Sequence, residues 1–146
     1  MYNLISKEEL QTMFPILKSE ETAILNMVSS DGVALTSVFH AMKALYPNMA
    51  DGVKRNSING ELGEGKLLLH RVPETFVILT MPIQESWKSG YDIEYVHRGF
   101  LKISSIFKER NIESIAIQEG LIPTDVIDKF IDSFDLPRIV YYKETK

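Results

Sequence analysis

The sequence predicts an α/β fold in which helices cover both faces of a mixed sheet, and a strand–helix–strand pattern is the main reason. Two near-continuous apolar runs, Thr75–Met81 and Ile112–Ile117, have the composition of strands buried on both faces. An amphipathic stretch from Asp92 to Asn111 separates them, and this order predicts parallel strands with a right-handed crossover. Ligands bind at the carboxyl ends of strands in such folds. We therefore expect function in the loops Met81–Lys88 and Gln118–Leu121.

Length and composition limit the classes of protein that fit. The 146 residues are one domain by size, 45% hydrophobic and 25% charged, with a net charge of -4. This acidic balance argues against nucleic acid as the main partner, because duplex binding draws on clustered lysine and arginine. The absence of cysteine excludes disulfides, thiolate nucleophiles and sulfur-liganded zinc. With no signal peptide and no apolar run of ~20 residues, we expect a cytoplasmic protein (host cytoplasm for a viral source) without a membrane partner.

The N-terminal elements follow from short apolar runs and turn residues. Tyr2–Ile5 is expected to be an edge strand, and Ser6 is a good cap for a short helix that must end before Pro15. Ala23–Val28 is predicted to be a buried strand. The polar segment Ser29–Gly32 ends that strand.

In the middle of the chain, a helix and a hairpin are expected. Apolar residues spaced by three and four predict a helix over Ala34–Tyr46. Met49–Asn56 is either a short helix or an ordered loop, and Asn59–Gly65 forms turns. Lys66–Val72 is a predicted strand, and the turn after it is short enough for pairing with Thr75–Met81.

The C-terminal part adds one helix and one strand. After the predicted strand Ile112–Ile117, Thr124 and Asp125 are expected to cap a helix. Its apolar face consists of Val126, Ile127, Phe130, Ile131 and Phe134. Arg138–Tyr142 is the last predicted strand, and no linker or repeat divides residues 1–146, which we expect to form a single domain.

Two segments carry candidate chemistry, and each has two interpretations. Ser29–Leu35 is a strand-to-helix loop with two interpretations: an anion site built from backbone N–H groups, or simply a helix cap. Asp31 argues against the anion site, because its carboxylate would repel a phosphate. Trp87 is either an anchor packed on the sheet or a platform for a base or sugar ring. Glu85 is a candidate general base without a partner in the sequence.

No metal or cofactor is expected. The three histidines, His40, His70 and His97, are scattered over two helices and a strand without ligand spacing.

Three blocks of the chain occur in a characteristic order. The first runs from Asn26 to Pro47, the second from Gly60 to Leu68, and the third from Pro82 through Trp87 to Ile112–Ile117. In order and spacing they resemble the macro domain family, in the branch that includes the DarG-type antitoxins and related ADP-ribosyl glycohydrolases. The resemblance covers nearly the whole chain and implies a three-layer α/β/α sandwich around a roughly six-stranded mixed sheet. It also implies a crevice for ADP-ribose, which some members of the family remove from protein or DNA.

Several positions that act in the family carry other residues here. Ser29 stands where the family has an asparagine that orients the distal ribose, while Gly32 matches a loop glycine. Leu35 and Ser37 replace two glycines that let the backbone close on the pyrophosphate. Gln84 replaces a lysine that acts in catalysis in this branch.

The second phosphate loop of the family also departs from the pattern. A Gly-rich segment of the family is contracted to Gln118–Pro123, and Glu119 would repel a phosphate if it faces the crevice.

The resemblance therefore implies a retained frame with a degenerate site. The leading hypothesis is a non-catalytic binding or interaction module, with a protein partner, a nucleotide-like ligand, or both. The ligand-binding candidates are Asn26, Ser29, Ser30, Gly32, Gln84, Trp87, Gln118 and Gly120. The alternative is an ADP-ribose-binding protein or an ADP-ribosyl glycohydrolase with a rearranged site, for which Asn26, Asp31 and Glu85 are the catalytic candidates. A third hypothesis is an accessory factor with no small ligand.

Overall fold

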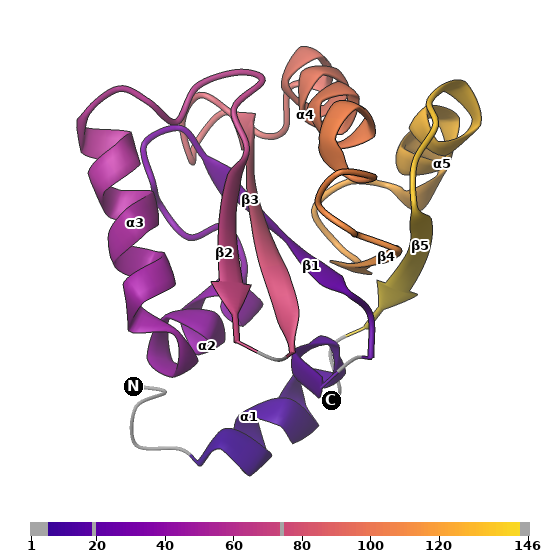
Figure 1. Ribbon diagram of the computed structural model, residues 1–146. Coiled ribbons are helices and arrows are strands. Elements are labelled where there is room, and N and C mark those ends of the chain that lie inside the picture. Colours follow the sequence, from indigo (N-terminus) through magenta and orange to yellow (C-terminus); the bar gives the residue numbers. More distant parts are fainter. Residues whose placement is uncertain (1–5, 19, 74, 144–146) are drawn as a thin grey trace.

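A computed structural model describes residues 6–18, 20–73 and 75–143 of the chain. In this part, a five-stranded sheet lies between two layers of helices (Figure 1). The strands are β1 (Ala23–Ser29), β2 (Leu68–Val72), β3 (Phe76–Gln84), β4 (Ser114–Gln118) and β5 (Arg138–Tyr142). The helices are α1 (Lys7–Met13), the 3₁₀ helix η2 (Pro15–Lys18), α2 (Ser37–Leu45), α3 (Pro47–Ile58), α4 (Ile93–Ile106) and α5 (Thr124–Ser133).

The sheet has the order β2-β3-β1-β4-β5, with β1 at its centre. Strand β1 is parallel to both β3 and β4, and β5 is parallel to β4. Strand β2 pairs antiparallel with β3, which confirms the predicted hairpin and makes the sheet mixed. The strands on either side of α4 are parallel as predicted, but β1 lies between them, so the crossover skips one strand.

The predicted fold class is confirmed, with one difference in the strand count. The described residues contain five strands rather than about six. The additional edge strand predicted at Tyr2–Ile5 lies outside the described residues.

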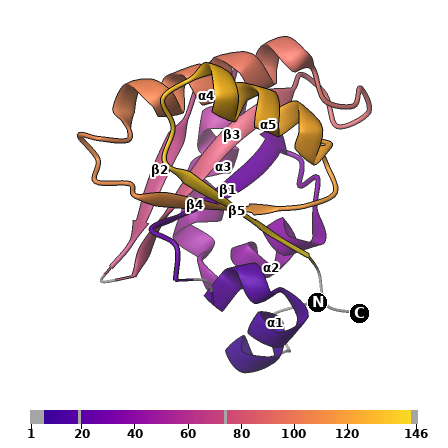
Figure 2. The ribbon, with the colours of Figure 1, turned by 90° about the vertical axis from the view of Figure 1, so that its right-hand side faces the viewer.

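Side chains of the central strand alternate between two apolar cores. Leu25 and Met27 point to the layer of α4 and α5, whereas Ile24 and Val28 point to the layer of α1, η2, α2 and α3. Figure 2 shows the two layers on opposite sides of the sheet, seen along its edge. All seven residues of β1 are buried, as expected for a central strand with both faces covered.

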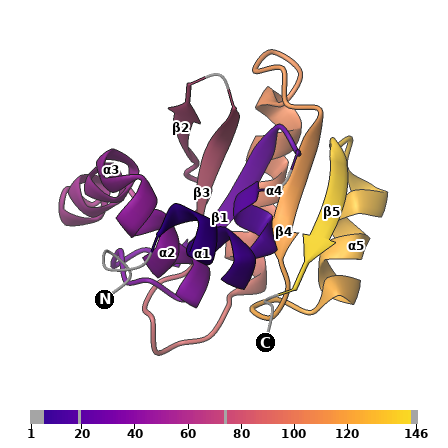
Figure 3. The same ribbon diagram turned by 90° about the horizontal axis from the view of Figure 1, so that it is seen from below.

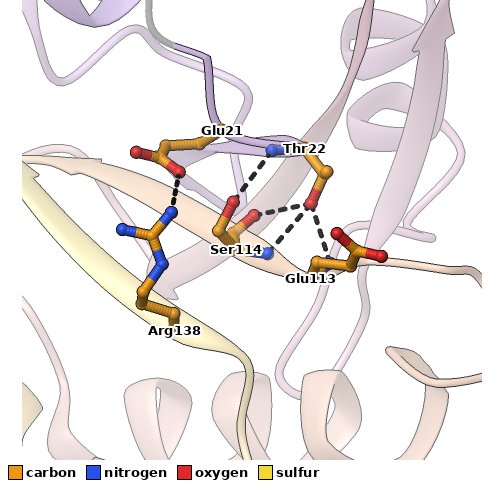
Figure 4. A network of polar contacts seen from close by, with 5 residues as sticks. All are labelled: Glu21, Thr22, Glu113, Ser114 and Arg138. Carbon is orange, nitrogen blue, oxygen red and sulfur yellow. Dashed lines mark hydrogen bonds and ion pairs between the residues drawn. The ribbon is translucent and has the colours of Figure 1, made fainter.

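Polar contacts fix the entry to the sheet at the N-terminal ends of three strands (Figure 4). The hydroxyl of Thr22 accepts the N–H groups of Glu113 and Ser114 at 2.8 and 2.9 Å and donates to the carbonyl of Ser114 at 3.0 Å. The N–H of Thr22 donates in return to the Ser114 hydroxyl at 3.1 Å. Beside them, Arg138 pairs with the buried Glu21 at 2.9 Å. These contacts join the start of β1 to the starts of β4 and β5.

Strand β3 is longer than predicted, which changes where the loop after it begins. It continues through Pro82 to Gln84, so the loop starts at Glu85 rather than at Pro82. The N–H of Val77 points toward β1, where it donates to Thr22. Because successive N–H groups of a strand point in opposite directions, the nitrogen of Pro82 points away from β1, to the side of β2. The pairing of β3 with β2 ends at Thr80, before Pro82 is reached. The missing donor of the proline therefore interrupts no ladder hydrogen bond.

Other bounds differ by a few residues at the ends of helices. Helix α2 begins at Ser37 rather than Ala34, because Thr36 caps it through the N–H of Phe39. Helix α4 ends at Ile106 rather than Asn111, and α3 is a full helix of 12 residues. The predicted cap of α5 is wrong, since Pro123 precedes its first residue and no side chain caps it.

Candidate functional site

The carboxyl ends of β1 and β3 are joined by hydrogen bonds between the loops that follow them. The N–H of Ser30 donates to the carbonyl of Gln84 at 2.9 Å. The N–H of Trp87 donates to Oδ2 of Asp31 at 3.2 Å. The loops of the two strands therefore form one unit at this edge of the sheet.

Asp31 is the centre of this unit. Its Oδ1 accepts the hydroxyl of Ser29 and, at 3.2 Å, the N–H of Val33. Burial pulls the pKa of Asp31 upward, but the hydrogen bonds from Ser29, Val33 and Trp87 outweigh it and hold the pKa below its ordinary value of 3.8. Both carboxylate oxygens of Asp31 therefore accept hydrogen bonds from the loops after β1 and β3.

Gly32 is required by the shape of this loop. Its φ of +78° lies in the left-handed region, which favours glycine. A Cβ at this position would lie 2.9 Å from Cβ of Ser57, on α3. The glycine thus lets the loop pack against α3.

Most of the polar candidate residues at the strand ends are buried, and Ser29 and Gln84 form hydrogen bonds within the protein. Gln84 is only 3% exposed, and its Nε2 donates to the carbonyl of Ser86 at 2.6 Å. Ser29 is fully buried and bonds to Asp31. The hydroxyl of Ser30 is buried without a hydrogen-bond partner in the described residues. Gln84 therefore offers neither a positive charge nor a nucleophile at the position where the resemblance places a catalytic lysine.

No hydrogen bond or ion pair joins the side chains of the three catalytic candidates, Asn26, Asp31 and Glu85, in the described part of the chain. Asn26 is 2% exposed within β1, and its Nδ2 donates to Oγ1 of Thr80 at 3.1 Å, on the α3 side of the sheet. Asp31 lies in the loop beyond the strand, and Glu85 is exposed without a hydrogen bond or ion pair to the described residues.

A crevice of about 360 Å³ lies between the loop after β1 and the loop after β4. It brings together the predicted residues Gln118 and Gly120, and also Leu35 and Ser37, where the resemblance places glycines. The described residues that line it are Phe14, Leu35, Thr36, Ser37, Val38, Gln118, Glu119, Gly120, Leu121 and Lys143. Asn26, Ser29, Gln84 and Trp87 do not line it.

Among the crevice residues that were not predicted, Phe14 and Lys143 come from outside the predicted loops. Phe14 comes from the end of the N-terminal helix, and Lys143 follows the last strand. Both reach the crevice through long-range packing, for which neither residue carries a local motif.

The crevice has a mixed electrostatic character. The first turn of α2 opens onto it and contributes the positive end of a helix dipole. Glu119 faces the crevice with a carboxylate, and Nζ of Lys143 lies 3.9 Å from it. The side-chain oxygen of Gln118 is buried without a partner in the described residues. This lining suits a ligand that combines apolar and neutral polar surface better than one with dense negative charge.

Trp87 lies outside the crevice and is exposed over 53% of its surface. Nζ of Lys88 lies 5.2 Å from the centre of its ring. About half of the Trp87 surface is therefore open to solvent, and its role as an anchor or as a platform stays a prediction.

Within the described ranges, no group of three or more His, Cys, Asp or Glu side chains could hold a metal ion. No helix in the same part of the chain is long and apolar enough to cross a membrane.

Comparison with solved structures identifies the fold. The macrodomain of Mycobacterium tuberculosis DarG is similar with a TM-score of 0.74 and 21% identity, over 87% of this chain and 92% of that chain. The macrodomain of Thermus aquaticus DarG has a TM-score of 0.73 and 20% identity, over the same shares. Thermosipho africanus DarTG in complex with ADP-ribose has a TM-score of 0.72 and 18% identity, over 86% of this chain and 39% of that chain.

Curated sequences give a consistent result at low identity. DNA ADP-ribosyl glycohydrolases of Mycobacterium bovis and Mycobacterium tuberculosis are 22% identical over 139 residues. The alignments cover 86% of this chain, which spans 40% of the length of these relatives. No family model matches the chain.

Proposed function

This chain has the macro domain fold, and the expected likeness to DarG-type domains is confirmed; from this premise we propose that it is a non-catalytic binding module. Its ligand is nucleotide-like and binds in the crevice between the loops after β1 and β4. ADP-ribose is the first candidate, since a solved relative contains it. In this proposal the crevice recognises a ligand or a group attached to a partner, and does not cleave it.

The observation that carries the proposal is the commitment of the candidate catalytic groups to the fold. Gln84 is buried, neutral and bonded to Ser86. Asp31 is held by three hydrogen bonds from the loops. Asn26 points to the opposite side of the sheet from α4 and α5. A glycosidic bond in the crevice would therefore meet neither a free base nor a cation from these positions.

Binding is supported by the crevice itself. A volume of about 360 Å³ remains open although Leu35 and Leu121 line it. Leucine walls add apolar contact, and Thr36, Ser37 and Gln118 supply neutral hydrogen-bonding groups. Glu119 weakens the attraction for a pyrophosphate, so we expect AMP and ADP-ribose to depend on ring contacts more than on phosphate contacts.

Calorimetry with ADP-ribose, NAD and AMP tests the proposal. We expect saturable binding of at least one of them, and loss of that binding in Ser37→Tyr, which places a ring in the crevice. His40→Tyr is the matched control, because His40 is exposed on the same helix and does not line the crevice. Binding that survives Ser37→Tyr would place the ligand elsewhere.

A second function has one specific observation in its favour. The curated relatives are named DNA ADP-ribosyl glycohydrolases, and Glu85 leaves one exposed carboxylate at the end of β3. A hydrolysis assay on ADP-ribosylated DNA and ADP-ribosylated protein separates the two functions. Release of ADP-ribose that is lost in Glu85→Gln would establish a rearranged enzyme and overturn the non-catalytic module.

A protein partner remains a further part of the proposal. If the three nucleotides produce no heat and a pull-down recovers one defined protein, the fold acts through that protein and the ligand part is wrong. The cytoplasmic location stays a prediction.

A further inference from the structure

A second groove, of about 230 Å³, lies between α3 and the β2–β3 hairpin. Figures 1 and 3 show α3 alongside β2, the edge strand of the sheet. We propose that this groove binds a small hydroxylated organic anion, with a phosphate or carboxylate group at its outer end. None of the described residues lines both this groove and the crevice.

At the inner wall of the groove, Thr80 and its hydrogen-bonded neighbour Asn26 have unused hydrogen-bonding capacity. Thr80 is 1% exposed, lines the groove, and its hydroxyl accepts a hydrogen bond from Asn26 without donating one to a described residue. Asn26 is not among the described lining residues, but it contacts the groove residue Met49, is 2% exposed, and has no described partner for its Oδ1. Buried polar groups are normally paired, so the free donor of Thr80, with the unpaired acceptor of Asn26 beside it, points to a hydroxylated ligand that reaches Thr80 from the groove.

The outer part of the groove favours an anion. Arg55 and His70 line it together with the amide of Asn56, and no carboxylate is among the described lining residues. Arg55 makes no ion pair in the described part of the chain. Since the protein as a whole has a net charge of -4, a groove with an unpaired guanidinium and no acid is a local exception. A guanidinium recognises phosphate and carboxylate groups through paired N–H donors.

Gly52 keeps the groove open. It lies inside α3, where glycine is unfavourable by about 0.5–1 kcal/mol relative to alanine. A Cβ built there would meet only the guanidinium of Arg55, at 3.9 Å. Close packing therefore does not explain this glycine, in contrast to Gly99, whose Cβ would lie 2.3 Å from Sδ of Met81. Space for a bound molecule does explain it.

The test uses ribose 5-phosphate and L-malate as probes, with inorganic phosphate as the reference, in titration calorimetry on the whole chain. We expect saturable binding of ribose 5-phosphate or L-malate, and the probe that binds identifies the anionic group. Gly52→Leu should abolish this binding by filling the groove, and it should not unfold the protein because leucine is a good helix former. Arg55→Gln should weaken it about tenfold, the loss expected for one charge-assisted hydrogen bond.

Lys54→Gln is the matched control, since Lys54 is exposed on the same helix outside the groove; it should leave the affinity unchanged. Gly52→Leu should also leave nucleotide binding in the crevice unchanged, which separates this proposal from the previous one. Absence of binding by both organic probes would overturn the site. Equal affinity for inorganic phosphate would overturn the assignment of a hydroxylated ligand, and binding that survives Gly52→Leu would overturn the location.

Discussion

The backbone N–H of Trp87 donates to the carboxylate of Asp31 at 3.2 Å, across 56 positions of the sequence. This bond joins the loop after β1 to the loop after β3. It places a half-exposed tryptophan at the edge of the sheet without burying its ring. The residue that would repel a phosphate therefore has a structural role in this chain, and the geometry of both loops depends on it.

Substitution Asp31→Ala should loosen the two loops. Asp31 itself is largely exposed, so we expect a modest loss in the free energy of unfolding, about 1 kcal/mol, near the typical net value of a hydrogen bond. Limited proteolysis should at the same time cut the segment from Glu85 to Tyr91 faster. Asp51→Ala is the control, because Asp51 is exposed on α3. Equal stability and equal protection in both variants would remove the structural role of Asp31.

The contribution of Asp31 should also depend on pH. Its pKa in the folded protein is lowered below the ordinary value of 3.8 because the hydrogen bonds from Ser29, Val33 and Trp87 outweigh the effect of burial. A depressed pKa stabilises the fold above the ordinary pKa, and this stabilisation is lost as the pH falls through the lowered pKa. Urea denaturation at pH 7 and at pH 3 should therefore show a smaller difference between wild type and Asp31→Ala at pH 3. A difference that grows on acidification would contradict the assigned direction.

The elements could largely be predicted because their patterns are local. The buried strand at Ala23–Val28 and the apolar stripe of α4 follow from runs and periodicities that the chain carries within a few residues. The observed ends of strands and helices differ from the predicted ones where tertiary contacts determine them. Pro82 stays in β3 because the β2 pairing has ended beside it, and the position of that end cannot be derived from Pro82 alone.

The candidate site was predicted less completely, for a related physical reason. The loops at the carboxyl ends of the strands were expected, and Gln118 and Gly120 do line the crevice. However, Phe14 and Lys143 enter it from the two ends of the chain. Conversely, Asn26 was predicted as a site residue but does not line the crevice. The layer that a strand side chain faces follows from the alternation along β1 and not from the type of residue.

Thr22 should contribute strongly to stability through its contacts with the start of β4 (Figure 4). Thr22→Val preserves the shape of the side chain but leaves the N–H groups of Glu113 and Ser114 without their acceptor. These hydrogen bonds are exposed or partly buried, so we expect a loss of about 1–2 kcal/mol in the free energy of unfolding, near the net value of one or two hydrogen bonds. Thr12→Val is the control, because Thr12 makes one exposed hydrogen bond within α1. Equal losses in the two variants, measured by urea denaturation, would show that the contacts of Thr22 do not hold the strands together.

Close packing between α4 and β3 depends on Gly99. A Cβ at this position would lie 2.3 Å from Sδ and 2.6 Å from Cγ of Met81, which is fully buried. Gly99→Ala should therefore destabilise the protein by about 1–3 kcal/mol, as overpacking in a filled core does. Gly63→Ala is the control, since no atom lies within 4 Å of a Cβ built there.

A double-mutant cycle tests whether the clash with Met81 is the cause. Met81→Ala alone creates a cavity and costs about 2–5 kcal/mol, but it removes the atoms that a Cβ at Gly99 would meet. Gly99→Ala should then cost little in the Met81→Ala background, with an interaction energy of about 1 kcal/mol or more between the two sites. Additive losses, measured by thermal and urea denaturation, would mean that Gly99 is required for another reason than its contact with Met81.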